Sequence, residues 1–526
     1  MFRDRDFDMT SAEPSQAVSL VQDLELEVLF RAMSRDDSYL LKVARAAVLA
    51  SVESVEVIRY RQAALGDCLR HRDVVRETYA IAVEALEREK KIWGWSSMRR
   101  QPDSSLHRSV EVLELFVSIL KRLRRVAEEH GKKFQSEAFS ALFGMLTREL
   151  DDGYLQEVEA HLRQLTFRTG LVMNAELGPW NKGSNYVLNR SPEAVPNWWE
   201  RVQGWVEETF VQREERYFYQ IADRDEAGFR ALAELRNRGI ARVATALARS
   251  TAHILDFFEM LRLELAFYVA ALNLHERISQ KGEAVCIPEP RPCEETTFRS
   301  RGLYDVCLSL SVSERVIPSD IAGEDKRLVM ITGANRGGKS TFLRAIGQAQ
   351  LMMQCGLFVS AEDFRANVCS GLFTHYKREE DIAMKSGKLD EELGRMSAVV
   401  RNVKAGGVVL LNESFGSTNE REGSEIGRGI VGALIEKNIK VFYVTHLFDL
   451  AQSFWREQLR DALFLRAERL PDGQRTFRLM EGEPLSTSFG EDLFRLIFGV
   501  PIKPALVPVR VIDPMQGSKP RGDDRG

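Results

Sequence analysis

The chain has 526 residues, of which 44% are hydrophobic and 29% charged, an ordinary balance for a soluble protein of two or more domains. No run of 18 apolar residues occurs, which argues against a membrane-spanning helix. The net charge of -4 gives no general support for nucleic-acid binding, so any such surface is expected to be a local basic patch.

The two ends and the cysteines indicate a cytoplasmic protein with disordered tails. Residues 1–16 are charged and polar, which is unlike a secretory signal and favours a disordered tail. Residues 515–526 have a similar composition, and we expect a second disordered tail there. The six cysteines form no CxxC or Cys/His metal spacing, so reduced thiols are expected.

Residues 17–290 are expected to be mostly helical. Apolar residues recur at spacings of three and four up to residue 162. Between 163 and 190 they alternate with other residues, which predicts short strands. A long helical pattern follows over 196–279, and its apolar last part predicts a buried helix. Three prolines at 288–292 then mark the predicted domain boundary.

Residues 291–514 are expected to form an α/β domain. Strand and helix patterns alternate after residue 300, which is typical of a parallel sheet with crossover helices. Strands are expected near 327–332, 408–411 and 440–445, and helices near 339–354 and 422–437.

A phosphate-binding loop follows the first of these strands. The segment from Gly333 to Ser340 fits GxxxxGK[ST], with a strand before it and a helix after it. Lys339 should reach the β and γ phosphates of ATP, and the Ser340 hydroxyl should ligate Mg²⁺. The residues expected to bind the nucleotide are Gly333, Ala334, Asn335, Arg336, Gly337, Gly338, Lys339, Ser340 and Thr341.

Two further strand ends carry candidate catalytic residues. Four apolar residues precede Asn412 and Glu413, which is the Walker B form with Asn in place of the usual Asp. Asn412 is therefore expected in the metal shell with Ser340, and Glu413 is expected to polarise the attacking water. His446 ends the next strand and should lie at the same ligand-binding edge.

These motifs resemble those of the MutS mismatch-repair family. TGANRGGKSTFLR is similar to the family's TGPNxGGKST loop, and LLNESFGSTNEREG is similar to its Walker B and signature segment. VTHLFDLA resembles its TH-x-x-x-L element, residues 317–321 resemble its VPNDI, and residues 488–490 resemble a late S-[YF]-G element. The likeness is strong over 315–500 and weaker over 160–300.

The resemblance implies a helical core and lever region followed by an ABC-like P-loop NTPase domain. It implies an ATPase that uses ATP and Mg²⁺ to switch a DNA clamp, with mismatched DNA as the ligand. It also implies a homodimer, in which Ser417, Thr418 and Asn419 face the nucleotide of the partner chain.

Two departures from the family pattern leave alternatives open. Asn412 removes a charge near Mg²⁺, although Glu420 or Glu422 could compensate, and it favours a nucleotide-controlled scaffold with little turnover. About 300 residues precede the ATPase domain and most are expected to be helical, so we expect no amino-terminal mismatch-reading domain. That favours a paralogue acting on branched DNA or recombination intermediates.

Two basic clusters are candidate DNA contacts. One runs from Lys121 to Arg125 and is followed by Lys132 and Lys133, and the other lies between residues 88 and 100. Because Glu128 and Glu129 sit within the first cluster, an ordinary solvated helix face is the favoured interpretation.

Overall fold

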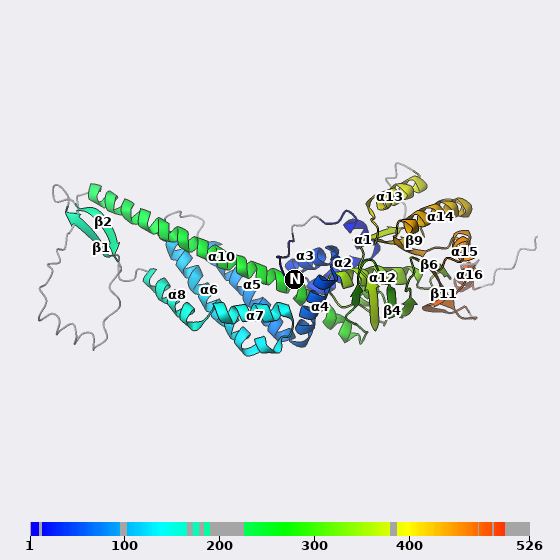
Figure 1. The fold of residues 1–526 in the computed structure, drawn as a ribbon, viewed down its shortest axis with the longest axis horizontal. Coiled ribbons are helices and arrows are strands. Elements are labelled where there is room, and N and C mark those ends of the chain that lie inside the picture. Colours follow the sequence, from blue (N-terminus) through cyan, green and yellow to red (C-terminus); the bar gives the residue numbers. More distant parts are fainter. Residues whose placement is uncertain are drawn as a thin grey trace, which may run out of the picture.

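The computed structural model describes residues 2–9, 13–94, 102–165, 172–177, 183–189, 226–378, 387–471, 473–485 and 489–499. The molecule is elongated, with a helical arm at one end and an α/β domain at the other (Figure 1). The predicted order of a helical region followed by an α/β domain is therefore confirmed. Within these residues, no helix combines the length and the apolar character needed to cross a membrane.

The helical region owes its form to amphipathic helices with well-defined starts. Asp37 accepts hydrogen bonds from the backbone N–H groups of Tyr39 and Leu40, and Ser54 and Ser136 cap two later helices in the same way. The helices are α1 (Ala17–Asp23), α2 (Leu26–Ser34), α3 (Ser38–Leu49), α4 (Val55–Arg70), α5 (Arg72–Gly94), α6 (Pro102–His130), α7 (Glu137–Glu149), α8 (Asp152–Leu165) and α10 (Glu226–Gln280), with a short 3₁₀ turn η1 (Gly131–Lys133).

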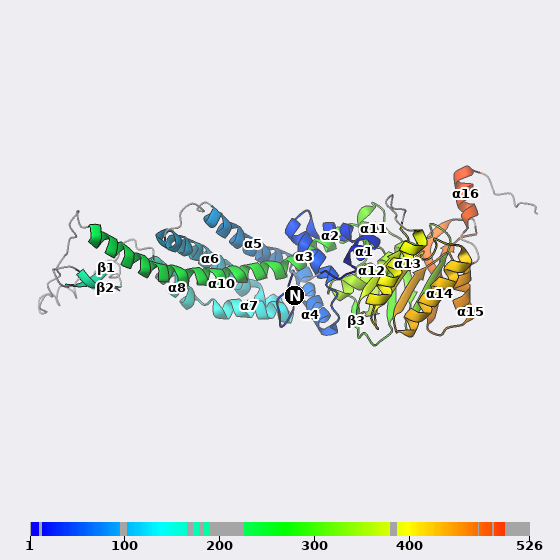
Figure 2. The ribbon, with the colours of Figure 1, turned by 90° about the horizontal axis from the view of Figure 1, so that it is seen from above.

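Helix α10 runs the length of the arm and packs against α5 and α6 (Figure 2). Its last part is buried, as the apolar sequence predicts. Near the outer end of the arm, β1 (Val172–Leu177) and β2 (Gly183–Asn189) pair antiparallel, which agrees with the predicted strands. The helical pattern expected over 196–225, the tail 515–526 and Ser488 lie outside the described residues.

The amino-terminal segment differs from the predicted disordered tail where it is described. Phe7 is only 5% exposed and belongs to the main hydrophobic core, and its backbone N–H donates to Glu264. Arg3 forms an ion pair with Glu137. The Phe2 and Phe7 rings stack on each other, and Phe2 packs partly buried against the same core, so this charged segment has enough apolar surface to be held in place.

The α/β domain is built on a six-stranded sheet in the order β12-β11-β6-β10-β9-β8. All neighbours are parallel except β12, which runs antiparallel to β11. Val444 pairs with both Ile331 and Asn412, so the carboxyl ends of the central strands meet at one edge. The strands are β6 (Leu328–Gly333), β8 (Leu372–Tyr376), β9 (Val408–Asn412), β10 (Lys440–Val444), β11 (Ala462–Arg469) and β12 (Arg475–Glu481).

Both faces of this sheet are covered, which explains why its strands read as continuous apolar runs. Val409 and Val441 point to a core formed with α14 (Glu420–Glu436) and α15 (Phe448–Arg456). Leu410 and Phe442 point to the other face, which is covered by α12 (Lys339–Gln354). The remaining helices are α11 (Val306–Ser311), α13 (Lys388–Asn402) and α16 (Gly490–Phe498).

A second, four-stranded sheet packs against the opposite side of α12, which is buried along its whole length. Its order is β3-β7-β4-β5. The predicted boundary between residues 290 and 291 falls inside β3, because this short strand pairs with β7. The strands are β3 (Glu289–Arg291), β4 (Phe298–Leu303), β5 (Ser319–Ala322) and β7 (Asp363–Asn367).

The helical region and the α/β domain share one hydrophobic core. Leu24, between α1 and α2, packs so closely on α12 that a Cβ at Gly347 would lie 2.8 Å from its Cδ2 atom. Gln348 of α12 donates a hydrogen bond to the Leu24 carbonyl at 3.0 Å. The start of the helical region is therefore fixed directly to the helix that follows the phosphate-binding loop.

Candidate active site

The loop between β6 and α12 needs glycine at three positions. Gly333 and Gly338 have φ values of +102° and +87°, in the left-handed region. A Cβ at Gly337 would lie 2.6 Å from the Cβ of Ala467 on β11. The loop therefore turns tightly against β11, and its backbone leads directly into the amino terminus of α12.

Lys339, the first residue of α12, holds its ammonium inside this loop. Its Nζ atom donates to the carbonyl oxygens of Gly333 and Ala334 at 3.0 and 2.9 Å, and the residue is 6% exposed. Burial lowers the pKa of Lys339, while the charge of Glu413 opposes that shift. A cation so desolvated binds an anionic oxygen more strongly than a solvated one.

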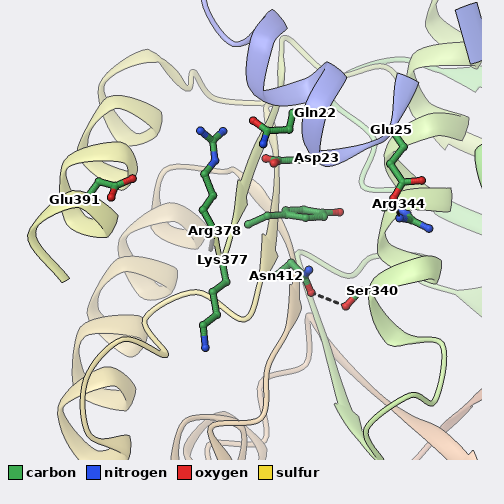
Figure 3. A pocket seen from close by; sticks show the side chains of 10 residues that line it. Gln22, Asp23, Glu25, Ser340, Arg344, Lys377, Arg378, Glu391 and Asn412 are labelled. Carbon is green, nitrogen blue, oxygen red and sulfur yellow. Dashed lines mark hydrogen bonds and ion pairs between the residues drawn. The ribbon is translucent and has the colours of Figure 1, made fainter. Parts of the chain in front are cut away.

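Ser340 and Asn412 meet at the side of the loop. The Ser340 hydroxyl donates to Asn412 Oδ1 at 2.9 Å, from the first turn of α12 to the last residue of β9 (Figure 3). These are two neutral oxygen groups. The described part of the chain holds no cluster of three or more His, Cys, Asp or Glu suited to a metal ion. A cation here would therefore depend on the oxygens of a bound nucleotide.

Glu413 stands in a strained turn directly after β9. Its φ of +52° and that of Phe415, +65°, are unusual for residues other than glycine. The Glu413 N–H donates to the Val444 carbonyl at 2.8 Å, and the Phe415 N–H donates to Glu392 Oε1 of α13 at 2.6 Å. The Glu413 side chain is therefore carried on backbone that is fixed on both sides.

A buried histidine on β8 supports the same turn. His375 Nδ1 lies 2.7 Å from the Ser414 hydroxyl, and its other ring nitrogen lies 3.1 Å from the Glu392 carbonyl. Burial lowers the pKa of His375 to about 4, so the ring is neutral at pH 7. His375 was not singled out from the sequence, because nothing in a strand pattern distinguishes it from other inward-facing residues.

His446 lies beside the turn and is exposed. A Cβ at Gly416 would be 3.5 Å from His446 Cε1 and 3.7 Å from Lys377 Nζ. The structure thus brings Lys339, Glu413 and His446 to the carboxyl edge of the sheet, as the strand pattern predicts. Their chemical roles stay predictions.

The Ser417–Asn419 segment directly precedes α14, and Asn419 is the N-cap of that helix. Asn419 Oδ1 accepts from the Glu422 N–H at 3.0 Å, and Thr418 bonds the Glu422 carboxylate. Glu420 accepts from the Phe448 N–H, the first residue of α15, at 2.9 Å. Both acids that could compensate for Asn412 are thus engaged at helix amino termini.

Strand β12 closes the loop on its other side. A Cβ at Gly338 would lie 3.2 Å from the Phe477 carbonyl oxygen. Arg475 donates to the Asn335 carbonyl at 3.2 Å and also binds Asp492 of α16. The Arg469 and Arg475 guanidiniums hold the pKa of the Asp492 carboxyl well below its usual range. These contacts carry no local sequence signal and were not predicted.

A cavity of about 610 Å³ adjoins Ser340 and Asn412. Part of its wall comes from the α1–α2 junction, which lies at the far end of the sequence (Figure 3). Sequence motifs give no indication of this contribution. The lining residues are Gln22, Asp23, Glu25, Ser340, Arg344, Tyr376, Lys377, Arg378, Glu391 and Asn412.

Comparison with known proteins identifies both parts of the chain. A model of the MutS2 N-terminal domain matches residues 53–281, and a model of MutS domain V matches residues 329–502. The first match covers most of the helical arm, and the second covers the phosphate-binding loop, Asn412, Glu413 and His446.

The chain belongs to the MutS family.

Three curated MutS-family relatives illustrate the likeness. A DNA mismatch repair protein MutS of Syntrophomonas wolfei is 29% identical over 269 residues, which are 50% of this chain and 31% of the relative. An Endonuclease MutS2 of Lactobacillus acidophilus is 32% identical over 139 residues, 26% of this chain and 18% of the relative. MutS protein homolog 4 of Mus musculus is 26% identical over 176 residues, 34% of this chain and 18% of the relative. The chain therefore matches less than a third of the length of each relative.

The basic cluster on α6 of this MutS-family chain is largely paired with acids. Arg122 binds Glu84, and Lys121 binds Glu159, each at 2.6 Å. Arg124 binds both Glu128 and Asp152. This arrangement favours the solvated helix face over a preformed DNA-contacting patch.

Proposed function

We propose that this MutS-family protein binds and hydrolyses ATP with Mg²⁺ at the carboxyl edge of the six-stranded sheet. The observation that supports this best is the position of Lys339, whose buried ammonium lies within the glycine loop beside the Ser340–Asn412 pair. A phosphate oxygen is the ligand that such a desolvated cation and the α12 amino terminus would bind together.

The residues present fit Mg²⁺ bound together with a nucleotide. Ser340 and Asn412 offer a hydroxyl and an amide oxygen side by side, which suits a hard cation that takes its charged oxygens from phosphate. Bound Mg²⁺ would neutralise developing charge on the phosphates. Glu413, on its fixed turn, would orient and polarise the attacking water, and His446 would lie beside that turn.

A composite site between two copies of the chain is part of this proposal. The Ser417–Asn419 segment stands at the amino terminus of α14, where the helix dipole favours an anion although Glu420 and Glu422 already lie in the first turn. We propose that this terminus faces the γ phosphate bound by a partner chain, as the family resemblance implies.

DNA is the proposed ligand of the helical arm. Relatives of the chain are named for DNA mismatch repair and as an endonuclease, and the arm matches the MutS2 N-terminal model. Because no amino-terminal mismatch-reading domain is expected, any DNA affinity should come mainly from phosphate contacts, so we expect salt-sensitive binding and little mismatch discrimination. Branched DNA therefore remains a proposed alternative to mismatched DNA.

A second candidate is a nucleotide-controlled scaffold with little turnover. The neutral Asn412 at the Ser340 hydroxyl favours it, because a carboxylate is absent where Mg²⁺ would be held. Single-turnover hydrolysis separates the two. Cleavage of bound ATP within one binding lifetime supports the ATPase, whereas release of intact ATP supports the scaffold.

One experiment tests the DNA proposal. Binding to homoduplex, mismatched duplex and a four-way junction would be measured with and without ATP at several salt concentrations. We expect ATP to change the affinity for DNA and salt to weaken it for every shape. Equal and negligible binding in all conditions would refute the DNA-binding role.

A further inference from the structure

The cavity beside Ser340 and Asn412 is lined in part by acidic side chains from the opposite end of the sequence. Asp23 is the last residue of α1, and Glu25 lies in the turn to α2. This junction is attached to α12, since Arg344 bonds Glu25 across 319 sequence positions and also binds the buried Asp305 at 2.8 Å. The helical region thus forms one wall of the cavity at the proposed metal side of the nucleotide site.

Most acids that line the cavity already have cationic partners. Glu25 is paired with Arg344, and Glu391 lies 3.7 Å from Arg395 Nε. Asp23 differs from both. It is 8% exposed, and its Oδ2 atom has no hydrogen-bond partner among the residues that the structure describes. An unpaired buried carboxylate oxygen costs free energy unless a cation or donor compensates for it.

The two cations whose charges act on Asp23 hydrogen-bond to other groups. Arg378 Nη2 donates to the Ser19 hydroxyl at 3.5 Å, and Arg395 Nη1 donates to the Tyr376 carbonyl at 3.0 Å. Burial raises the pKa of the Asp23 carboxyl, whereas the Thr374 hydroxyl and the charges of these two guanidiniums lower it and favour the carboxylate. The Asp23 carboxylate points into the cavity that also contains the Asn412 amide (Figure 3).

We propose that Asp23 supplies, through water in this cavity, the negative charge toward nucleotide-bound Mg²⁺ that Asn412 lacks. Mg²⁺ gives up its waters reluctantly, so a carboxylate can act on it from the outer shell. The inference rests on the proposed function. It makes the metal side of the ATP site depend on α1, so that the helical region contributes directly to cation binding.

The test measures metal affinity rather than turnover. Full-length protein is titrated with a fluorescent ATP analogue in EDTA, and Mn²⁺ binding to the protein–nucleotide complex is then followed by electron paramagnetic resonance. Asp23→Asn keeps the side-chain shape and removes the charge, and Asp23→Glu keeps the charge. Asp363→Asn, at an exposed position on β7, is the matched control.

We expect Asp23→Asn to weaken Mn²⁺ binding by roughly three- to tenfold, since one charge is lost across a partly hydrated cavity. Its nucleotide affinity in EDTA should be unchanged, and Asp23→Glu and Asp363→Asn should bind Mn²⁺ like the wild type. Adding Asn412→Asp to Asp23→Asn should restore Mn²⁺ affinity.

Each other outcome has a defined meaning. Equal Mn²⁺ affinity in wild type and Asp23→Asn overturns the inference while the ATP site stands. Failure of the wild type to bind the nucleotide at all overturns the proposed function, and the inference with it. If Asp23→Asn does not fold, the same titration with Asp23→Glu decides, because weakened Mn²⁺ binding with the carboxylate kept contradicts a charge effect.

Discussion

The Glu392 carboxylate accepts a hydrogen bond from the backbone N–H of Phe415, with 2.6 Å between Oε1 and the nitrogen. This bond links α13 to the turn that carries Glu413, in which Glu413 and Phe415 both have left-handed backbone conformations. Such conformations persist only where surrounding contacts hold them. Glu392 is therefore a positioning residue for Glu413.

Replacing Glu392 by Gln should misplace Glu413 without removing it. A charge-assisted bond contributes about twice as much as a neutral one, so we expect ATP turnover to fall by roughly tenfold. The KM for ATP should change little, because Lys339 and the glycine loop are untouched. Steady-state kinetics test this, with Glu436→Gln at the exposed end of α14 as the control. A rise in KM with constant kcat would contradict the positioning role.

Lys339→Met should abolish tight nucleotide binding while leaving the fold intact. Lys339 is a buried cation bonded to two carbonyl oxygens and to no carboxylate among the described residues, so its removal should not lower the free energy of unfolding appreciably. We expect ATP affinity to fall by at least about tenfold, which corresponds to about 1.4 kcal/mol. Titration calorimetry and thermal melting measure the two effects, with Lys437→Met as the control. Unchanged affinity and turnover would refute the phosphate-binding assignment.

Asn412→Asp should strengthen the metal site. A carboxylate at this position adds charge beside the Ser340 hydroxyl, and Mg²⁺ prefers charged oxygen ligands. We expect a lower Mg²⁺ concentration for half-maximal ATPase and a higher turnover. If both stay the same, either Asn412 lies outside the metal shell or another acid already supplies the charge.

The buried His375 should make stability depend on pH in a defined window. Its pKa is about 4 in the folded state, below the ordinary value of 6.5, so the folded protein takes up its proton less readily. The contribution of neutral His375 to the free energy of unfolding is therefore complete above pH 6.5. Up to about 3 kcal/mol of it is lost as the pH falls toward 4. Urea unfolding at pH 7, 5.5 and 4.5 tests this, and His375→Gln should show a smaller slope. Equal slopes would assign the pH dependence to other groups.

Dimerisation should depend on nucleotide and on the α14 terminus. With ATP, a Glu413→Gln variant should sediment as a dimer, because bound ATP would persist between the two chains. Asn419→Ala removes the α14 cap and should weaken both the dimer and the fold by about 1 kcal/mol, whereas Asn419→Asp keeps the cap. A strict monomer under all conditions would exclude the composite site.

The positions of the main site residues could be anticipated because parallel strands bring their carboxyl ends together. Gly333, Asn412 and Val444 end adjacent strands, so motifs that follow each strand must meet at one edge. The same logic predicts nothing about residues that reach the site through tertiary packing. Asp23 and Glu25 belong to a short helical junction without any motif, and the packing of Leu24 on α12 together with the Arg344–Glu25 pair brings them to the cavity.

The expected disorder of residues 1–16 shows the limit of composition as a guide. That segment is charged and polar, yet Phe2 and Phe7, together with the Arg3–Glu137 ion pair, attach its described part to the arm. The roles of Glu420 and Glu422 could not be predicted either, because the sequence does not distinguish an acid at a helix start from an acid that binds a metal. Their hydrogen bonds assign both to helix ends.

Helix α10 can act as a long lever, because a small rotation at its packed end moves its outer end much further. Its 55 residues measure about 80 Å at about 1.5 Å per residue, and its last turns pack in the core shared with α2 and α11. A tilt of only about 5° at that base would displace the outer tip by about 7 Å if the helix stays straight. A small rotation where α10 packs on α2 and α11 is therefore amplified along the arm into a displacement of about 7 Å near β1 and β2.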